Sequence, residues 1–185
     1  MERVNLILPK TGVKIDFQPG VRLYFLAGPI RGGGDWQKKA ITLLASQDNN
    51  CYVACPCWYT QESSLREHLL LTNDVTLKFA RQTLWERYYL ALALRYGAII
   101  FWLPVENADN PRAKEDGPYA RETYGEIGRW SMKSLIEGTY PIIGGETGFP
   151  GLEQIQANLN EDFGYPFPIY PSLEETIKAA QKMIK

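Results

Sequence analysis

The stretch YARETYGEIGRW at residues 119–130 holds a carboxylate in an unusual setting. Its pattern predicts a helix, yet Glu126 lies between Gly125 and Gly128, and each glycine costs a helix about 1 kcal/mol relative to alanine. Paired with Arg129 three residues on, Glu126 would be an ordinary surface acid. The two glycines clear side-chain bulk around the carboxylate, which favours a functional role for Glu126.

A second stretch, LAGPIRGGGDW at residues 26–36, joins an apolar run to a predicted helix. Glycines let the backbone approach a ligand closely, and amides at a helix start can hold an anion. Arg31 adds a permanent charge with a fork geometry suited to phosphate. The spacing fits neither a Walker loop nor a dinucleotide fingerprint, and a plain flexible turn is the alternative. We predict that this loop binds substrate through Gly28, Pro29, Ile30, Arg31, Gly32, Gly33 and Gly34.

A carboxylate beside an anion cradle can attack or stabilise an oxocarbenium-like anomeric carbon, as retaining glycosidases do. Water or another acceptor then releases the covalent intermediate. A cradle for sugar hydroxyls or phosphate would suit a nucleoside or nucleotide. The cysteines Cys51, Cys55 and Cys57 match no zinc pattern, so we expect free thiols and neither a metal nor a cofactor.

The composition is that of an ordinary soluble protein. The 185 residues fit one domain, 1–185, with residues 1–20 as an N-terminal extension. A net charge of −1 argues against a nucleic acid polymer as partner. No stretch resembles a signal peptide or reaches the roughly 18 apolar residues of a membrane span, so we expect a cytoplasmic protein without a membrane partner.

Apolar runs alternate with helical patterns along the chain, which predicts a doubly wound, parallel α/β sheet. The first twenty residues predict an added hairpin or edge strand. Ligands of such sheets bind beyond the carboxyl ends of the strands, where the strand order reverses. The five expected strands are 21–27, 51–55, 97–104, 140–145 and 167–171, and the expected helices are 35–47, 74–95, 119–136, 151–159 and 172–184.

LYFLAGPIRGGGDW and YGEIGRW together resemble the glycine loop and the Tyr/Phe-Glu-Leu-Gly element of the nucleoside 2-deoxyribosyltransferase superfamily, including its deoxynucleotide N-glycosidase branch. WERYYLALALRYGAIIFWLP resembles the helix and strand between them, so the resemblance covers about residues 21–145. It implies a flavodoxin- or Rossmann-like sheet, Glu126 as nucleophile, and the loop of Gly28 to Gly34 with Arg31 holding the sugar and any 5′-phosphate. It also implies a homo-oligomer whose sites lie near subunit interfaces.

The chain departs from the family at its usual active-site aspartate. The matching region, RQTLWERYYLALALRYGA, contains no aspartate. Glu86 or Gln82 could substitute, although Glu86 also fits a surface acid near Arg87. The acid/base partner and the base preference therefore stay open.

Several other residues are candidates for the site. Asp35 suits a helix cap, and Trp36 could stack a base. Trp102 and Tyr119 could wall a base pocket or belong to the core. Trp58 and Trp85 are expected in the core. Near Glu126, Arg121 and Glu122 complete the predicted substrate-binding set.

The sequence thus predicts cleavage or exchange of the N-glycosidic bond of a (deoxy)nucleoside or its monophosphate. The alternative is a nucleotide-binding module on the same fold that has lost catalysis with the missing aspartate. A third option is an enzyme that cleaves sugar nucleotides or cyclic nucleotides with the same glutamate. Transfer and hydrolysis are not distinguished.

Overall fold

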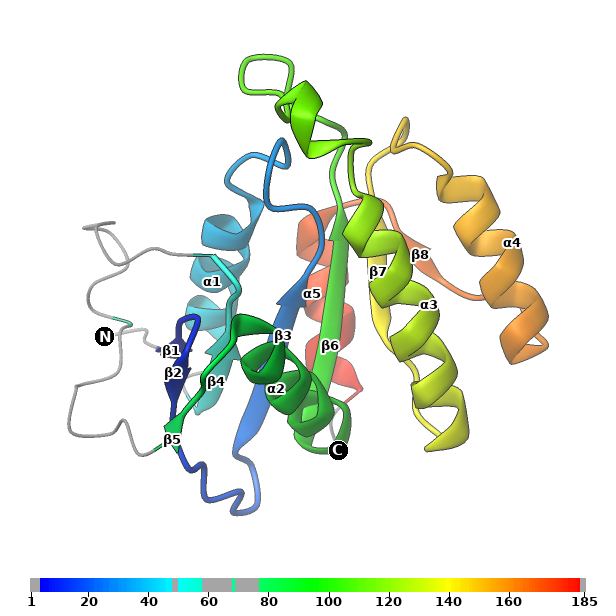
Figure 1. Cartoon of the computed structure of the whole chain (residues 1–185). Helices are drawn as coiled ribbons and strands as arrows, with labels where there is room; N and C mark the ends of the chain where they lie inside the picture. Colours follow the sequence, from blue (N-terminus) through cyan, green and yellow to red (C-terminus); the bar gives the residue numbers. More distant parts are fainter. Residues whose placement is uncertain (1–3, 48–49, 58–67, 69–76, 184–185) are drawn as a thin grey trace. The chain divides into compact units, whose positions relative to one another are not determined.

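The computed structural model describes residues 4–47, 50–57, 68 and 77–183. Six strands form one sheet in the order β1-β4-β3-β6-β7-β8, and β2 and β5 form a separate pair (Figure 1). The strands are β1 (Asn5–Ile7), β2 (Thr11–Gly12), β3 (Arg22–Ala27), β4 (Cys51–Ala54), β5 (Leu77–Lys78), β6 (Gly97–Leu103), β7 (Ile142–Gly145) and β8 (Ile169–Tyr170). The α-helices are α1 (Trp36–Gln47), α2 (Gln82–Tyr96), α3 (Arg121–Ile136), α4 (Leu152–Phe163) and α5 (Leu173–Lys182).

The predicted doubly wound α/β sheet is confirmed. Strand pairs β1–β4, β3–β4, β6–β7 and β7–β8 are all parallel. The five predicted strands are present, and β1 adds the predicted edge strand. From β3 the chain adds β4 on one side, and from β6 it adds β7 and β8 on the other, so the strand order reverses at β3 and β6.

The chain divides into two compact units, residues 4–26 with 37–99 and residues 27–36 with 100–183. The loops that follow β3 and β6 both belong to the second unit. The expectation of a single domain over residues 1–185 stays a prediction. No helix in the described part of the chain is long and apolar enough to cross a membrane.

Trp85 and Tyr89 of α2 organise the core of the first unit. Both side chains are fully buried, and their ring centroids lie 5.2 Å apart. The Trp85 indole donates to the Thr11 carbonyl at 2.7 Å, and the Tyr89 hydroxyl accepts from the Val13 amide at 2.9 Å. The predicted core role of Trp85 is confirmed, while Trp58 lies outside the described residues.

The helix predicted over 74–95 begins later than expected. Residues Leu77–Lys78 form β5, and the helix begins at Gln82. The cause is a long-range pairing: Gly12 lies opposite Leu77 in an antiparallel ladder. A Cβ on Gly12 would lie 2.5 Å from the Leu77 Cβ, so only glycine permits this pairing. Residues 74–76 lie outside the described part.

In the second unit, α5 packs against β7 and β8, and α3 packs against α4. Figure 1 shows α3 and α4 side by side. The Ser172 hydroxyl accepts from the Glu175 amide at 3.2 Å, which confirms the predicted start of α5. Helix α4 continues to Phe163, beyond the predicted end at residue 159.

Gly144 of β7 tests the packing of α5 on the sheet. A methyl group at Gly144 would overlap the Thr176 hydroxyl oxygen and lie 2.9 Å from the Trp102 ring. We expect Gly144→Ala to lower the free energy of unfolding by about 1–3 kcal/mol, measured by urea denaturation, because such overpacking strains a core.

Gly125→Ala is the matched control, since a methyl group there meets no atom within 4 Å. It should raise the free energy of unfolding by about 0.4–1 kcal/mol. Unchanged stability of Gly144→Ala would contradict the close packing of β7 against α5.

Candidate functional site

The loop between β3 and α1 is a tight turn whose backbone runs close to its neighbours. A Cβ on Gly28 would overlap the Trp102 carbonyl oxygen, and one on Gly33 would overlap the Pro29 carbonyl oxygen. The same Pro29 oxygen accepts from the Trp36 indole at 2.8 Å. Glycine at positions 28 and 33 therefore has a structural reason that does not involve a ligand.

Trp36 is 3% exposed, and its indole hydrogen bond to Pro29 stabilises this turn. The structure gives it a packing role here and not an exposed face for stacking a base. Ile30 is 44% exposed, and the Arg31 side chain is 67% exposed, so both predicted binding residues face outward. Asp35 is exposed and directly precedes α1, and its role as a cap stays a prediction.

The long loop after β6, residues 104–120, lies against the glycine turn. The Asn107 amide donates to the Gly32 carbonyl at 2.7 Å. A Cβ on Gly32 would lie 3.0 Å from the backbone nitrogen of Arg112 and 3.2 Å from Glu106 Oε1. We call residues 28–35 and 104–120 the paired loops, because direct contacts join them.

Charged side chains also join the paired loops. Arg31 forms an ion pair with Asp116. The Arg112 side chain, only 9% exposed, bonds Glu122 Oε2 at 3.1 Å through Nη1 and the Asp116 carbonyl through Nη2. Two guanidinium groups therefore converge on residue 116, one on its carboxylate and one on its carbonyl.

Arg112 is the site residue that the sequence analysis missed. Its Nε is buried and has no hydrogen-bond partner within the described structure. A buried polar group without a partner costs about 1–3 kcal/mol, more when charged. The sequence evidence for Arg112 was weak, because it is an arginine inside a loop of unusual length with no motif around it.

The predicted residues Arg121 and Glu122 lie at the start of α3 and form an exposed ion pair at 3.0 Å. The pKa of Glu122 is lowered to about 2, first by the hydrogen bond from Arg112 and, to a smaller extent, by Arg121. Glu122 is therefore a carboxylate that anchors the end of the long loop to α3.

Tyr119 and Trp102 differ in their exposure. The Tyr119 hydroxyl donates to the Pro104 carbonyl at 2.8 Å, and its pKa is raised by burial and then by the nearby Glu106 and Glu146 carboxylates. Tyr119 is half-buried, whereas Trp102 is 4% exposed within β6. Trp102 thus belongs to the core, the alternative that the sequence left open.

Glu126 lies half-buried on α3, and its two flanking glycines are exposed. A methyl group at Gly125 or Gly128 would meet no atom within 4 Å. Packing within the protein therefore does not explain either glycine. Gly128 lines a pocket shared with α4, and Glu126 is not among the residues that line that pocket. The approach of Glu126 to a sugar held by the glycine turn stays a prediction.

Glu86 lies on α2 in the first unit and is half-buried. Its Oε1 accepts from Gln82 Nε2 at 2.9 Å, and Gln82 Nε2 also contacts the Pro56 carbonyl at 3.5 Å. The two residues proposed to replace the family aspartate are therefore bonded to each other, and their catalytic role stays a prediction.

The three cysteines are buried and free of disulfides. Burial raises the pKa of the Cys55 thiol well above its ordinary value, and Cys57 raises it further. A thiol of this kind is a poor nucleophile and a poor metal ligand at neutral pH. Within the described residues, histidine, cysteine and carboxylate side chains form no group of three that could hold a metal ion.

Comparison with known proteins adds no assignment. No protein-family model matches the chain, and no curated protein matches it. The chemistry of the site must therefore be argued from its own residues.

The ion pairs at the end of the long loop are testable by titration. We expect NMR of the Glu122 carboxyl carbon to report a pKa near 2. Because this pKa is below its unfolded value, the stabilisation is present above about pH 4.5 and is lost as the pH falls toward 2.

Arg112→Gln should return the Glu122 pKa most of the way to its ordinary value, since Arg112 is the largest cause of the shift. Arg121→Gln, which removes the neighbouring guanidinium, is the matched control and should move it less. A larger shift in Arg121→Gln than in Arg112→Gln would show that the loop is not anchored as described.

Proposed function

We propose that this protein cleaves or exchanges the N-glycosidic bond of a (deoxy)nucleoside or its 5′-monophosphate, with Glu126 as the nucleophile. The proposal rests on the position of the paired loops. They follow β3 and β6, where the strand order reverses, which is where open α/β sheets bind ligands. The second of these loops leads directly into α3, the helix that carries Glu126.

The observation that carries the proposal is the unexplained glycine at position 125, directly before Glu126. It costs the helix about 1 kcal/mol, and neither protein packing nor the pocket with α4 accounts for the missing side chain. The open space next to the half-buried Glu126 carboxylate would accommodate the sugar ring of a substrate.

In the proposed reaction, the Glu126 carboxylate attacks C1′ of the sugar while the bond from C1′ to the base nitrogen breaks. The bonding electrons leave with the base, which takes up a proton from water. Water then attacks C1′ and completes a hydrolysis, or a second base attacks it and completes an exchange. Either acceptor restores the free carboxylate.

Arg31 favours a phosphorylated substrate. Guanidinium groups bind phosphate oxygens with matching geometry. In the structure, the Asp116 carboxylate pairs with Arg31, so a 5′-phosphate would compete with an internal carboxylate for the same guanidinium. The phosphate preference of the protein would then depend on the position of the long loop.

A nucleotide-binding module without turnover is the second candidate. The internal pairing of Arg31 with Asp116 favours it, as does the absence of the family's usual active-site aspartate from residues 81–98. The expected homo-oligomer fits the apolar side chains that α3 leaves exposed, Met132, Leu135 and Ile136. No nucleic acid polymer, membrane or cofactor enters either candidate function.

Trapping the intermediate tests the nucleophile. A 2′-fluorinated nucleoside or its monophosphate with a reactive leaving base should leave a glycosyl adduct on Glu126, identified by peptide mass spectrometry, because fluorine slows both steps and the leaving base keeps attack faster than release. Glu126→Gln should lose at least about a thousandfold in turnover while still binding nucleotide.

Glu137→Gln, at the far end of the same helix, is the control and should keep full turnover. An adduct on another residue would refute the assignment of Glu126. Nucleotide binding without turnover in the wild-type protein would establish the binding module instead.

Substitutions at the ion pair test the phosphate preference. Asp116→Asn should tighten binding of a nucleoside 5′-monophosphate about twofold to fivefold, the range of an exposed ion pair, and leave nucleoside binding unchanged. Arg31→Ala should weaken monophosphate binding selectively. The measurement is calorimetric titration with both ligands.

Asp109→Asn removes a different exposed carboxylate of the same loop and is the control for net charge. If Asp109→Asn tightens monophosphate binding as much as Asp116→Asn does, the effect is a general one of charge and Arg31 has no special part in it.

A further inference from the structure

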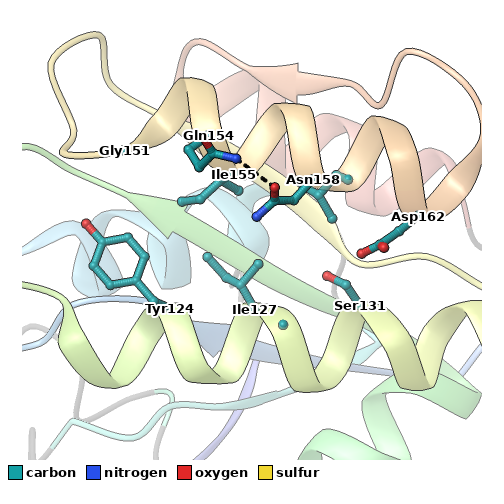
Figure 2. A pocket seen from close by; sticks show the side chains of 10 residues that line it. Tyr124, Ile127, Ser131, Gly151, Gln154, Ile155, Asn158 and Asp162 are labelled. Atoms are coloured by element: carbon teal, nitrogen blue, oxygen red, sulfur yellow. Dashed lines mark hydrogen bonds between the residues drawn. The ribbon is translucent and has the colours of Figure 1, made fainter.

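A pocket of about 280 Å³ lies between α3 and α4, away from the paired loops. Figure 2 shows side chains from both helices pointing into it. Its walls are mostly apolar, with Ile127 from α3 and Ile155 and Leu159 from α4. The other lining residues are Tyr124, Gly128, Ser131, Gly151, Gln154, Asn158 and Asp162.

Gly128 contributes no side chain to the wall of the pocket. Its position is exposed and a methyl group there would meet nothing within 4 Å. Alanine at this position would raise the stability of the helix by about 1 kcal/mol, and a larger residue would project into the hollow. The sequence thus keeps open a space that ordinary packing would fill.

Ser131 provides an independent sign of a missing ligand. The residue is 1% exposed, and its hydroxyl has no hydrogen-bond partner within the described structure. Figure 2 shows this hydroxyl pointing into the space between the helices. An unsatisfied buried hydroxyl costs about 1–3 kcal/mol, which a bound polar group would recover.

The remaining polar groups define the charge of that ligand. Gln154 Nε2 is bonded to Asn158 Oδ1 at 2.8 Å, and the Tyr124 hydroxyl to the Pro150 carbonyl at 2.7 Å. Asp162 makes no ion pair with any described residue, and it lies toward the Ser131 end of the pocket in Figure 2. Helix α4 contains no lysine or arginine. The pocket therefore has one negative group and no positive one.

We propose that this pocket binds a small amine with an apolar body. The apolar body lies between Ile127, Ile155 and Leu159, and the ammonium group donates to the Ser131 hydroxyl and the Asp162 carboxylate. The volume is just below the range of about 300–1,000 Å³ for drug-sized ligands, which fits one aromatic ring with a short chain. Because Glu126 does not line the pocket, this site is independent of the proposed reaction.

Three probes with the same phenylethyl body and different head-group charge test the proposal: 2-phenylethylamine, 2-phenylethanol and 3-phenylpropionate. Two-dimensional NMR of the full chain should show the amine binding with a dissociation constant on the order of 0.1–1 mM. The alcohol should bind about twofold to fivefold more weakly, and the acid more weakly still. Equal binding of all three, or no binding of the amine, would overturn the proposal.

Substitutions locate the site. Gly128→Leu fills the pocket and should abolish amine binding, whereas Gly125→Leu on the same helix should not, because Gly125 does not line the pocket. Both positions have open space, so both variants should fold, as checked by thermal melting. Equal loss of binding in the two variants would place the amine elsewhere.

Two polar substitutions test the recognition of the head group. Asp162→Asn should weaken binding of 2-phenylethylamine about twofold to fivefold and leave that of 2-phenylethanol unchanged, with Glu161→Gln as the charge control. Ser131→Ala should weaken amine binding while preserving or raising the melting temperature, since it removes an unsatisfied hydroxyl. A Ser131→Ala variant that binds as well as wild type would contradict the proposed contact.

Discussion

The close approach of the β6 backbone to Gly28 sets the geometry of the candidate site. Without a side chain at residue 28, the Trp102 carbonyl can lie directly against the start of the glycine turn. The turn then folds back on itself through Gly33 and Pro29, and Trp36 fixes it by a bond to the Pro29 carbonyl. The long loop joins through the Gly32 carbonyl. Backbone atoms thus make most of these contacts, which leaves the side chains of Ile30 and Arg31 facing outward.

Helix α3 combines two separate surfaces. Successive residues of a helix are about 100° apart, so Glu126 points about 160° away from Gly128 around the helix axis. Tyr124, Ile127 and Ser131 lie on the Gly128 side and line the pocket with α4. A substrate beside Glu126 and an amine in that pocket would therefore contact opposite sides of one helix, and neither would exclude the other.

The order of strands and helices was predictable because local patterns determine it. Continuous apolar runs identified the parallel strands, and Ser172 with its acidic neighbours identified the start of α5. The start of α2 was not predictable, since the pairing of Leu77 with Gly12 joins segments that are distant in sequence. The end of α4 was placed too early for a different, local reason. Its last turn contains asparagine and aspartate, which have weak helix propensity, yet the helix continues to Phe163.

The site was predictable in its location and less so in its contacts. The glycine turn and Arg31 were identified from their residue types, but nothing in the sequence pairs Arg31 with Asp116. Arg112 was missed because a single arginine in a loop carries no spacing signal. The sequence did not decide whether Trp36 could stack a base, and its burial argues against an exposed stacking face.

The bond between the Tyr119 hydroxyl and the Pro104 carbonyl has a consequence for how this protein can vary. It joins the two ends of the long loop, so residues 104–119 form an Ω-loop that also contacts the glycine turn. Insertions or deletions inside such a loop change what it presents to a ligand while the strand before it and the helix after it keep their positions. A segment held in this way can therefore vary in length and sequence without any rearrangement of the fold.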